Sequence, residues 1–346
     1  MYASDLHTLA TRTDHLDGTG VNADLEEALT AFTGFALALG MSNASTALAA
    51  AYAAVGLAPG DEVIAPSLTA SETIAPLLRR GCTVVLADTL ADSLTINPEE
   101  VERLVTPRTK GLVGVDLAGW PHDTNALRRI ADKHGLVYVA DLAQGFSARN
   151  NGDHSGRAAH AAVLSLNAQK QLPAGEGGVL LTNDEALYQR VLRETQHPHR
   201  QARELGIERV NYFSANGRLS ALAASTAITN LPPAINRIHE QRHQAAELIT
   251  LLNATGLVDP IMIPDGCEPT FPYLTATWRN TPQPTALLTL LHDAGHDARL
   301  RNLPLHPLHT LPQVQGEFAR HVRTPEALPN TEKAARRVCI HVGGTP

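Results

Sequence analysis

One lysine, Lys170, lies between a short apolar segment and a glycine-rich turn in SLNAQKQLPAGEGG, residues 165–178. The apolar residues before it are typical of a buried strand. A lysine that bonds to a carbonyl compound needs such a place, because desolvation favours the neutral amine and glycines leave room for a bulky group. Ser165, at the predicted strand end, could bind a phosphate through its hydroxyl group. An exposed loop lysine is the plainer interpretation of this segment alone.

A carboxylate stands at the end of another predicted strand. In VYVADLAQG, residues 137–145, an apolar run ends at Asp141 and Gln144 follows. Open α/β sheets bind ligands at the carboxyl ends of their parallel strands. A carboxylate there could keep the ring nitrogen of pyridoxal phosphate protonated, which this cofactor needs in order to accept electrons. The alternative is that Asp141 caps the next helix, and the segment alone favours the cap.

A third segment, MSNASTALAAAY at residues 41–52, opens a predicted helix with small residues. The backbone N–H groups of Ala44, Ser45 and Thr46 can bind a phosphate at such a helix start, and the hydroxyl group of Ser45 can add a hydrogen bond. The alternative is that Asn43 or Ser45 is a plain N-cap. The three segments together, in this order, form one set suited to a phosphate-bearing carbonyl cofactor.

The elements that must position these side chains alternate between strands and helices from about residue 24 to 225. Short apolar runs separated by helical patterns are typical of a mostly parallel sheet covered on both faces, so we predict an α/β fold. The predicted strands are 62–65, 83–87, 111–115, 136–140, 162–166 and 179–182, and helices are predicted at 25–35, 45–55 and 125–134.

A change of pattern follows the helical segment 219–231. We expect Pro232 and Pro233 to break a long helix there, with a separate amphipathic helix over 235–252. The later part is rich in Pro and His. We therefore predict a large cofactor-binding domain over residues 1–230 and a smaller α+β C-terminal domain over 231–346.

Composition narrows the class of protein. The 346 residues carry a formal net charge of -7 and no basic stripe, which argues against a general nucleic-acid binder. The cysteines Cys82, Cys267 and Cys339 are far apart and follow no metal-ligand spacing, which favours a reducing compartment. We find neither a signal peptide nor an apolar run of about 20 residues, the length that spans a membrane. We expect a cytoplasmic protein with no membrane segment.

Beyond these patterns, residues 25–342 resemble the DegT/DnrJ/StrS family of fold-type I pyridoxal-phosphate aminotransferases, many of which aminate nucleotide-linked keto sugars. The most specific similar stretch is SLNAQKQLPAGEGGVLLTND. Other similar stretches are LAPGDEVIAPSLTASETIAPLLRRGCTVVLAD, TPRTKGLVGVDLAG, ANGRLSALAASTAITNL and LPNTEKAARRVCIHV.

The resemblance implies a role for each matching residue. Lys170 matches the lysine that holds the cofactor as a Schiff base and moves protons during transamination, and Asp141 matches the partner of the ring nitrogen. Asn216 matches an asparagine that reaches the phosphate from a neighbouring subunit, which implies a homodimer with shared active sites. The remaining matches are Gln144, near the phenolic oxygen of the cofactor, and Ala44, Ser45 and Ser165, around its phosphate.

Five positions depart from the family pattern. Ala70 stands where an aromatic residue usually stacks on the cofactor, so the stacking is lost or comes from elsewhere. Asp116 replaces a usual histidine, His160 replaces a common aspartate, and Ala44-Ser45 replaces Gly-Thr. These changes leave the cofactor assignment standing and favour a specialised biosynthetic reaction over a standard sugar substrate.

We expect an aminotransferase that moves an amino group from an amino-acid donor, glutamate or glutamine by resemblance, to a keto sugar or related carbonyl acceptor. One alternative is a pyridoxal-phosphate enzyme of another reaction type, namely a lyase, a dehydratase or a condensing enzyme. The other is a non-catalytic regulatory relative. Intact Lys170, Asp141 and Ser165 argue against the second alternative.

Two further segments call for an interpretation. The chain has 16 histidines, and we expect no metal site among them, although His306 lies in a segment that resembles the family's substrate region. The polar segment 196–206 is expected to form a loop over the active site. Its His and Arg side chains would there meet an anionic substrate or be solvated.

Overall fold

The centre of the protein is an eight-stranded sheet. The computed structural model describes residues 7–8, 11–207, 214–325 and 327–342. Six neighbouring strands run parallel, and one strand near the edge runs antiparallel to both of its neighbours. The predicted α/β fold with a mostly parallel sheet is confirmed. In sheet order the strands are β1 (Leu37–Met41), β9 (Gly178–Thr182), which is the antiparallel one, β8 (Ala161–Ser165), β5 (Val137–Asp141), β4 (Thr109–Val115), β2 (Glu62–Pro66), β3 (Thr83–Ala87) and β13 (Val322–Arg323).

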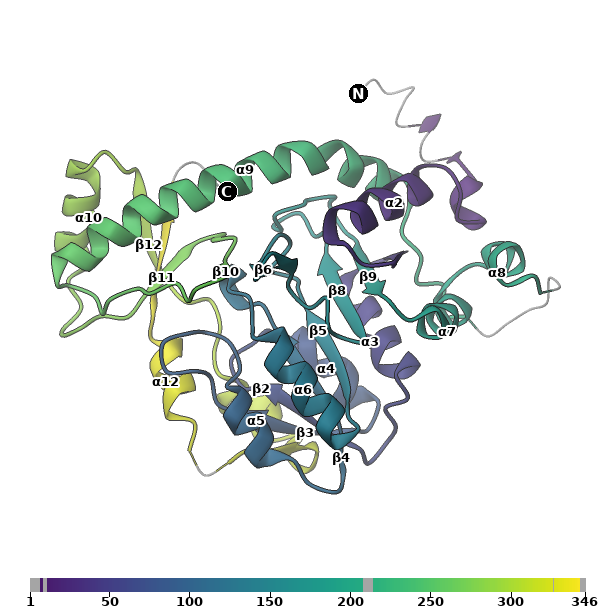
Figure 1. The fold of residues 1–346 in the computed structure, drawn as a ribbon, viewed down its shortest axis with the longest axis horizontal. Coiled ribbons are helices and arrows are strands. Elements are labelled where there is room, and N and C mark those ends of the chain that lie inside the picture. The colour runs from purple at the N-terminus through teal and green to yellow at the C-terminus, as the bar shows by residue number, and fades with distance from the viewer. Residues whose placement is uncertain (1–6, 9–10, 208–213, 326, 343–346) are drawn as a thin grey trace.

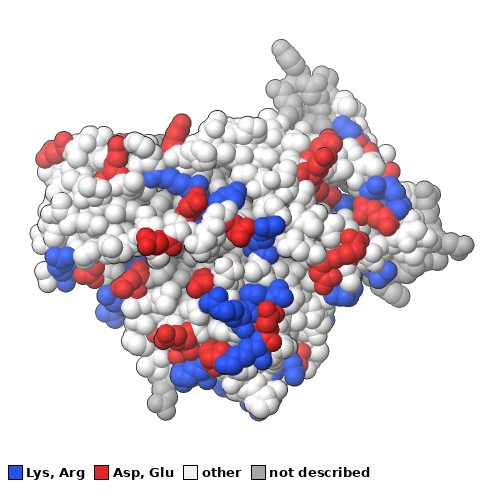
Figure 2. Space-filling view, in the orientation of Figure 1, with Lys and Arg blue, Asp and Glu red and all other residues white. Residues whose placement is uncertain are grey.

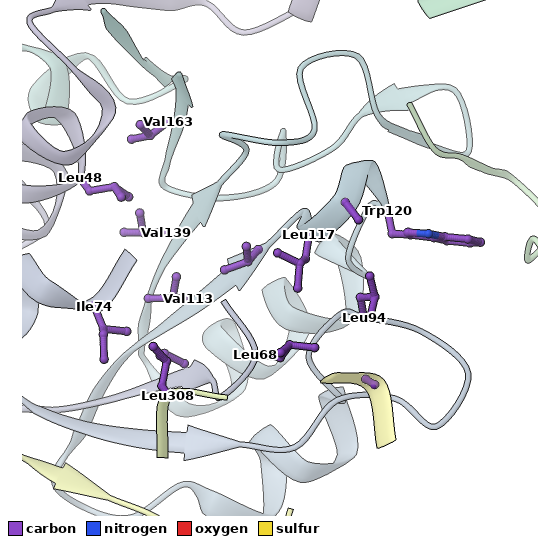
Figure 3. Packing of buried hydrophobic residues seen from close by; sticks show 14 of the residues in the cluster. Leu48, Leu68, Ile74, Leu94, Val113, Leu117, Trp120, Val139, Val163 and Leu308 are labelled. Carbon is purple, nitrogen blue, oxygen red and sulfur yellow. The ribbon is translucent and has the colours of Figure 1, made fainter. Parts of the chain in front are cut away.

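Helices cover both faces of this sheet, and each face has its own cluster of buried apolar side chains. Figure 3 shows one cluster, in which Val113, Val139 and Val163 of three adjacent strands point to the side of Leu48 and Ile74. Burial on both faces explains why the strands read as continuous apolar runs. The helices on the face of Leu48 are α3 (Ala44–Ala54), α4 (Ser71–Arg79) and α7 (Glu185–Thr195); those on the other face are α2 (Val21–Thr33), α5 (Pro98–Leu104), α6 (Thr124–His134) and the first part of α9 (Ala221–Thr255).

Helix α9 is the long helix that runs along one side of the molecule, from beside α2 to the C-terminal strands β11 and β12 (Figure 1). The expected break at Pro232 and Pro233 is wrong, because both prolines lie inside this single helix. A proline in a helix interior costs about 3 kcal/mol. Burial of Leu231, Ala234 and Ile238 against the sheet face offsets that cost, since tertiary packing supplies most of the stability of a helix in a protein.

The C-terminal part of the chain forms a three-stranded antiparallel sheet, which lies beside the C-terminal half of α9. Strand β13 comes from the same part of the chain yet joins the large sheet next to β3. The domain boundary near residue 230 stays a prediction, since α9 runs through it. The small sheet is β11 (Leu274–Ala276), β14 (Val338–Val342) and β12 (Ala298–Asn302), with α10 (Pro284–Asp293) and α12 (Pro329–Ala335); the other elements are β6 (Arg149–Asn150), β7 (Asp153–His154), β10 (Cys267–Glu268), α8 (Pro198–Leu205) and α11 (Pro312–Gln315).

The surface carries both signs of charge. On the face shown in Figure 2, basic and acidic side chains are interspersed. Among the helices that the structure describes, none has both the length and the apolar character that crossing a membrane requires.

Candidate active site

A cavity of about 350 Å³ opens at the carboxyl ends of β5 and β8, beside the starts of α3 and α4. This volume lies within the range of small-molecule sites. The structure brings together here all the predicted site residues except Asn216. The residues that line this cavity include Ala44, Ser45, Asp141, Gln144, Ser165 and Lys170.

Lys170 lies on a tight loop between β8 and β9. The backbone N–H of Leu166 donates to the carbonyl of Gly177 at 2.9 Å, and the N–H of Ala168 donates to Gly175 at 2.8 Å. A Cβ atom at Gly178 would lie 2.5 Å from the backbone of Asn43 and Ala44. Glycine at position 178 therefore allows β9 to pass directly against the start of α3, so that the lysine loop and the helix start line one cavity.

The first turn of α3 offers donors to this cavity. Asn43 is the N-cap, as one of the sequence alternatives had it, and its Oδ1 accepts a 2.8 Å hydrogen bond from the N–H of Thr46. The cap leaves the N–H groups of Ala44 and Ser45, which have no intrahelical acceptor at a helix start. Together with the hydroxyl groups of Ser45 and Ser165, this donor set fits a phosphate group, and the helix dipole favours its charge.

Asp141 is a buried carboxylate, 5% exposed, at the end of β5. Its Oδ2 accepts a 2.7 Å hydrogen bond from the hydroxyl of Thr73, and its Oδ1 accepts one of 3.0 Å from the N–H of Ala143. Burial raises the pKa of Asp141, while these two bonds and the charge of Lys170 act in the opposite direction. The helix-cap alternative is wrong, because no helix begins directly after β5. This carboxylate fits a cationic ring nitrogen.

Gln144 is held through its carbonyl oxygen. Oε1 accepts a 2.9 Å hydrogen bond from the N–H of Ala118 and one of 3.5 Å from the hydroxyl of Tyr273. Ala118 has a φ of 53°, an unusual conformation for a residue with a side chain. Because the oxygen is occupied, the amide NH₂ of Gln144 is the group left to donate a hydrogen bond in the cavity.

Ala70 lines the cavity as the N-cap of α4, beside Thr69 and Glu72. The described residues that line it include no aromatic side chain in place of the missing ring. His160, which replaces a common aspartate, does not line the cavity either. Its Nδ1 lies 3.0 Å from the backbone N of Tyr138.

Two residues that contact carboxylates at or just after strand ends were not predicted from the sequence. Thr73 contacts Asp141 from α4, and His122 contacts the buried Asp116 at 2.6 Å. Thr73 is buried in the structure, so its hydroxyl group needs a partner, but no local pattern in the sequence points to Asp141 as that partner. His122 carried no local signal, because only the fold brings it back to the end of β4.

Asn216 is exposed, has a φ of 51° and does not line the cavity of its own chain. Its contact with a phosphate in a neighbouring subunit therefore stays a prediction.

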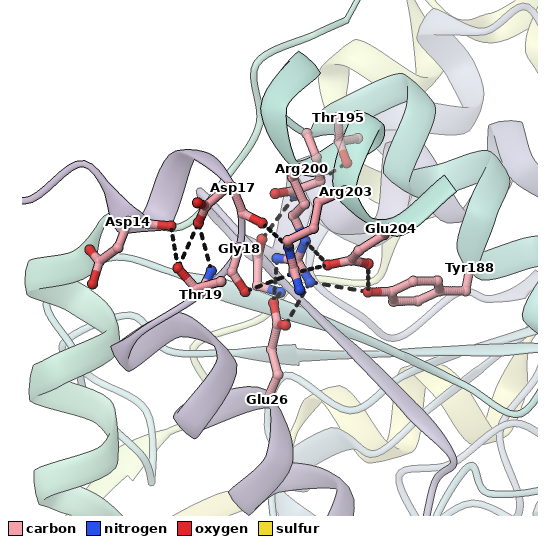
Figure 4. A network of polar contacts seen from close by, with 12 residues as sticks. Asp14, Asp17, Gly18, Thr19, Glu26, Tyr188, Thr195, Arg200, Arg203 and Glu204 are labelled. Carbon is pink, nitrogen blue, oxygen red and sulfur yellow. Dashed lines mark hydrogen bonds and ion pairs between the residues drawn. The ribbon is translucent and has the colours of Figure 1, made fainter. Parts of the chain in front are cut away.

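The expectation of a loop over the active site at residues 196–206 is wrong. Residues Pro198–Leu205 form α8, and Arg200, only 3% exposed, bonds Glu26 of α2 at 2.7 Å and Glu204 at 2.8 Å (Figure 4). The polar composition of this segment reflects a helix that is anchored by a buried ion pair. None of its residues lines the cavity.

His306 is exposed and does not line the cavity. Another histidine of the same segment, His309, lies with its Nδ1 2.8 Å from the hydroxyl of Ser67, directly after β2. In the described part of the chain, no three His, Cys, Asp or Glu side chains are grouped as metal ligands would be.

Comparison with known proteins gives consistent matches. Residues 8–343 match the model of the DegT/DnrJ/EryC1/StrS aminotransferase family. A pleiotropic regulatory protein of Geobacillus stearothermophilus is 32% identical over 316 residues, which are 90% of this chain and 81% of that protein. The dTDP-3-amino-3,4,6-trideoxy-alpha-D-glucose transaminase of Streptomyces venezuelae is 32% identical over 304 residues, which are 87% of this chain and 76% of the transaminase. The crystal structure of S. venezuelae DesV in complex with a ketimine intermediate superposes with a TM-score of 0.76 at 28% identity, covering 95% of this chain and 85% of DesV.

Proposed function

Because the chain belongs to the DegT/DnrJ/EryC1/StrS aminotransferase family, a family of pyridoxal-phosphate-dependent sugar aminotransferases, we propose that it binds pyridoxal phosphate at Lys170. We further propose that it transfers an amino group from an amino acid, glutamate or glutamine, to a keto sugar or related carbonyl compound. The similarity to a dTDP-sugar transaminase supports a sugar-like acceptor. The observation that carries the proposal is the placement of Lys170 and the buried Asp141 in one cavity with the start of α3.

Each residue then has a defined task. When bound, pyridoxal phosphate supplies an aldehyde that bonds to amines and a protonated ring that accepts electrons. The amine of Lys170 would hold the aldehyde and, when a substrate amine replaces it, take and return the proton at the substrate carbon that bears nitrogen. The carboxylate of Asp141 would keep a proton on the ring nitrogen. Ala44, Ser45 and Ser165 would bind the phosphate, and the NH₂ of Gln144 would donate to the phenolic oxygen.

A regulatory role is the second candidate, since one relative is named a pleiotropic regulatory protein. The side chains at the cavity favour the enzyme. A purely regulatory protein has no need of an amine, a buried carboxylate and a helix start around one cavity. Another reaction type on the same scaffold would keep the cofactor and differ in its products.

The decisive experiment is a visible absorption spectrum of the purified protein, followed by borohydride reduction and peptide mapping. We expect the reduced cofactor on Lys170 and none in a Lys170→Ala variant. Labelling at Lys110, Lys133 or Lys333 instead would overturn the site. Transamination is tested separately by adding glutamate or glutamine labelled with ¹⁵N at the α-amino group to the cofactor-loaded protein: release of the matching keto acid and transfer of ¹⁵N to the cofactor are expected. Absence of the keto acid with every amino donor would contradict an aminotransferase.

A further inference from the structure

Asp116 follows β4 directly, and its side chain is completely buried. Three donors meet on its Oδ1: the backbone N–H of His122 at 3.0 Å, Nδ1 of the same histidine at 2.6 Å, and the hydroxyl of Ser155 at 3.0 Å. Oδ2 is buried and has no hydrogen-bond partner among the described residues. All the polar contacts of this carboxylate therefore act on one oxygen and fix its orientation.

The histidine is itself held from its other side. Its Nε2 contacts the hydroxyl of Tyr138, and that hydroxyl lies 2.9 Å from the hydroxyl of Thr124. The ring packs on Gly114, where a Cβ atom would lie 2.4 Å from it. A buried chain of contacts thus runs from Ser155 through Asp116 and His122 to the start of α6. None of these side chains lines the cavity.

The backbone beside Asp116 touches two of the site residues. The N–H of Asp116 donates to the carbonyl of Asp141 at 3.0 Å. Two residues later, the N–H of Ala118, in its left-handed conformation, donates to Oε1 of Gln144 at 2.9 Å. The Asp116 carboxylate also packs directly against the backbone of Gly145. A Cβ atom added at Gly145 would lie only 2.3 Å from Oδ2 of Asp116. The turn after β4 and the turn after β5 are therefore held together by two hydrogen bonds and by direct packing.

We infer that Asp116 is a positioning residue, anchored by His122 and Ser155, that holds Asp141 and Gln144 in place against the edge of the cofactor. A left-handed alanine persists only where its surroundings hold it, and the anchored carboxylate two residues earlier does so. Catalytic groups work only when neighbouring contacts lock their geometry to a fraction of an ångström. This inference rests on the proposed binding of the cofactor at Lys170.

The test replaces His122, which holds Asp116 in place, with two side chains of nearly the same size and shape. His122→Asn keeps a donor close to the position of Nδ1, whereas His122→Leu removes it. We expect the leucine variant to bind pyridoxal phosphate about tenfold more weakly, or about 1.4 kcal/mol, with a changed dependence of its visible spectrum on pH. The asparagine variant should stay within about twofold of the native chain. Binding is measured by titrating cofactor-free protein with pyridoxal phosphate.

A matched control separates positioning from loss of stability. Val101→Ala creates a cavity in the buried cluster on α5, away from the active site, and should lower the unfolding temperature without changing cofactor affinity or spectrum. Should His122→Leu fail to fold, Ser155→Ala removes one donor to Asp116 and should show a smaller effect in the same direction. An affinity and spectrum equal to those of Val101→Ala would overturn the positioning role. Absence of any cofactor on Lys170 of the native chain would instead refute the proposed function.

Discussion

The hydroxyl group of Thr73 donates a 2.7 Å hydrogen bond to Oδ2 of Asp141, the carboxylate at the end of β5. Burial disfavours the charged form of this carboxylate and raises its pKa, whereas the Thr73 hydrogen bond lowers it. A residue of α4 therefore helps to keep Asp141 ionised, the form that can pair with a protonated ring nitrogen.

Thr73→Val should weaken the binding of pyridoxal phosphate. Without the hydroxyl group the pKa of Asp141 rises further, so less of the carboxylate is ionised at a given pH. A hydrogen bond to a charged group contributes about 1.5–3 kcal/mol, so we expect roughly a 10- to 100-fold loss of affinity. The loss should grow as the pH falls. Titration of cofactor-free protein at several pH values measures it, and Thr73→Ser, which keeps the hydroxyl, is the control. Equal affinities of the two variants at every pH would refute the role of this bond.

Asp141 should also leave a signature in the stability of the cofactor-free protein. Its folded-state pKa is raised above the ordinary value of 3.8, so between these two values the folded state binds more protons than the unfolded state. The free energy of unfolding contributed by this group therefore falls as the pH rises through that window. Asp141→Asn lacks the titration, so the native chain should lose stability relative to the variant as the pH rises. Urea unfolding from about pH 4 to about pH 8 measures the difference. A difference that is independent of pH would contradict the raised pKa.

The sequence predicts those parts of the site that depend on local pattern and on one rule of the fold. Asp141, Ser165 and Lys170 each follow an apolar run, and parallel strands bring their carboxyl ends to one edge of the sheet. Thr73 and His122 act through contacts that only the folded chain creates, so no periodicity points to them. Segment 196–206 was predicted as a loop over the active site, because its buried partner, Glu26, lies far away along the chain.

Arg200→Met tests the anchoring of α8. Removing one partner of a buried ion pair costs about 3–5 kcal/mol, because Glu26 is then left buried without its cation. Arg203→Met is the matched control: its ion pair with Glu204 is exposed on the arginine side, and exposed pairs contribute about 0–1 kcal/mol. Urea unfolding should separate the two variants by several kcal/mol. Cofactor affinity should be unchanged in both, since α8 does not line the cavity, and a selective loss of affinity in Arg200→Met would contradict this placement.

Ala70→Phe should tighten the binding of pyridoxal phosphate. The side chain at this position lines the cavity, and no described aromatic residue of this chain takes the place of a ring. Ring stacking contributes about 0.5–1.5 kcal/mol beyond area burial, which corresponds to roughly a 2- to 10-fold gain in affinity. Ala70→Leu adds apolar volume without a ring and separates stacking from simple burial. Weaker binding by the phenylalanine variant would mean that another group already occupies the space beside Ala70.

A pair of inactive variants tests whether two copies of the chain share each active site. If Asn216 serves the phosphate of a neighbouring copy, a mixed dimer of Lys170→Ala and Asn216→Ala chains has one site with both residues native and one site with both replaced. Each mixed dimer should therefore have up to about half of the activity of a native dimer, because one of its two sites is intact. Random exchange makes about half of all dimers mixed, so the whole mixture should reach about a quarter of the native activity. The exposed position of Asn216, outside its own cavity, is the geometry that such sharing requires. If Asn216 acted within its own chain, every site in the mixture would lack one of the two residues, and activity would stay at the level of the separate variants. Exchange of subunits is verified with chains of two different masses. If mixed dimers form and activity is still not restored, the sites are not shared.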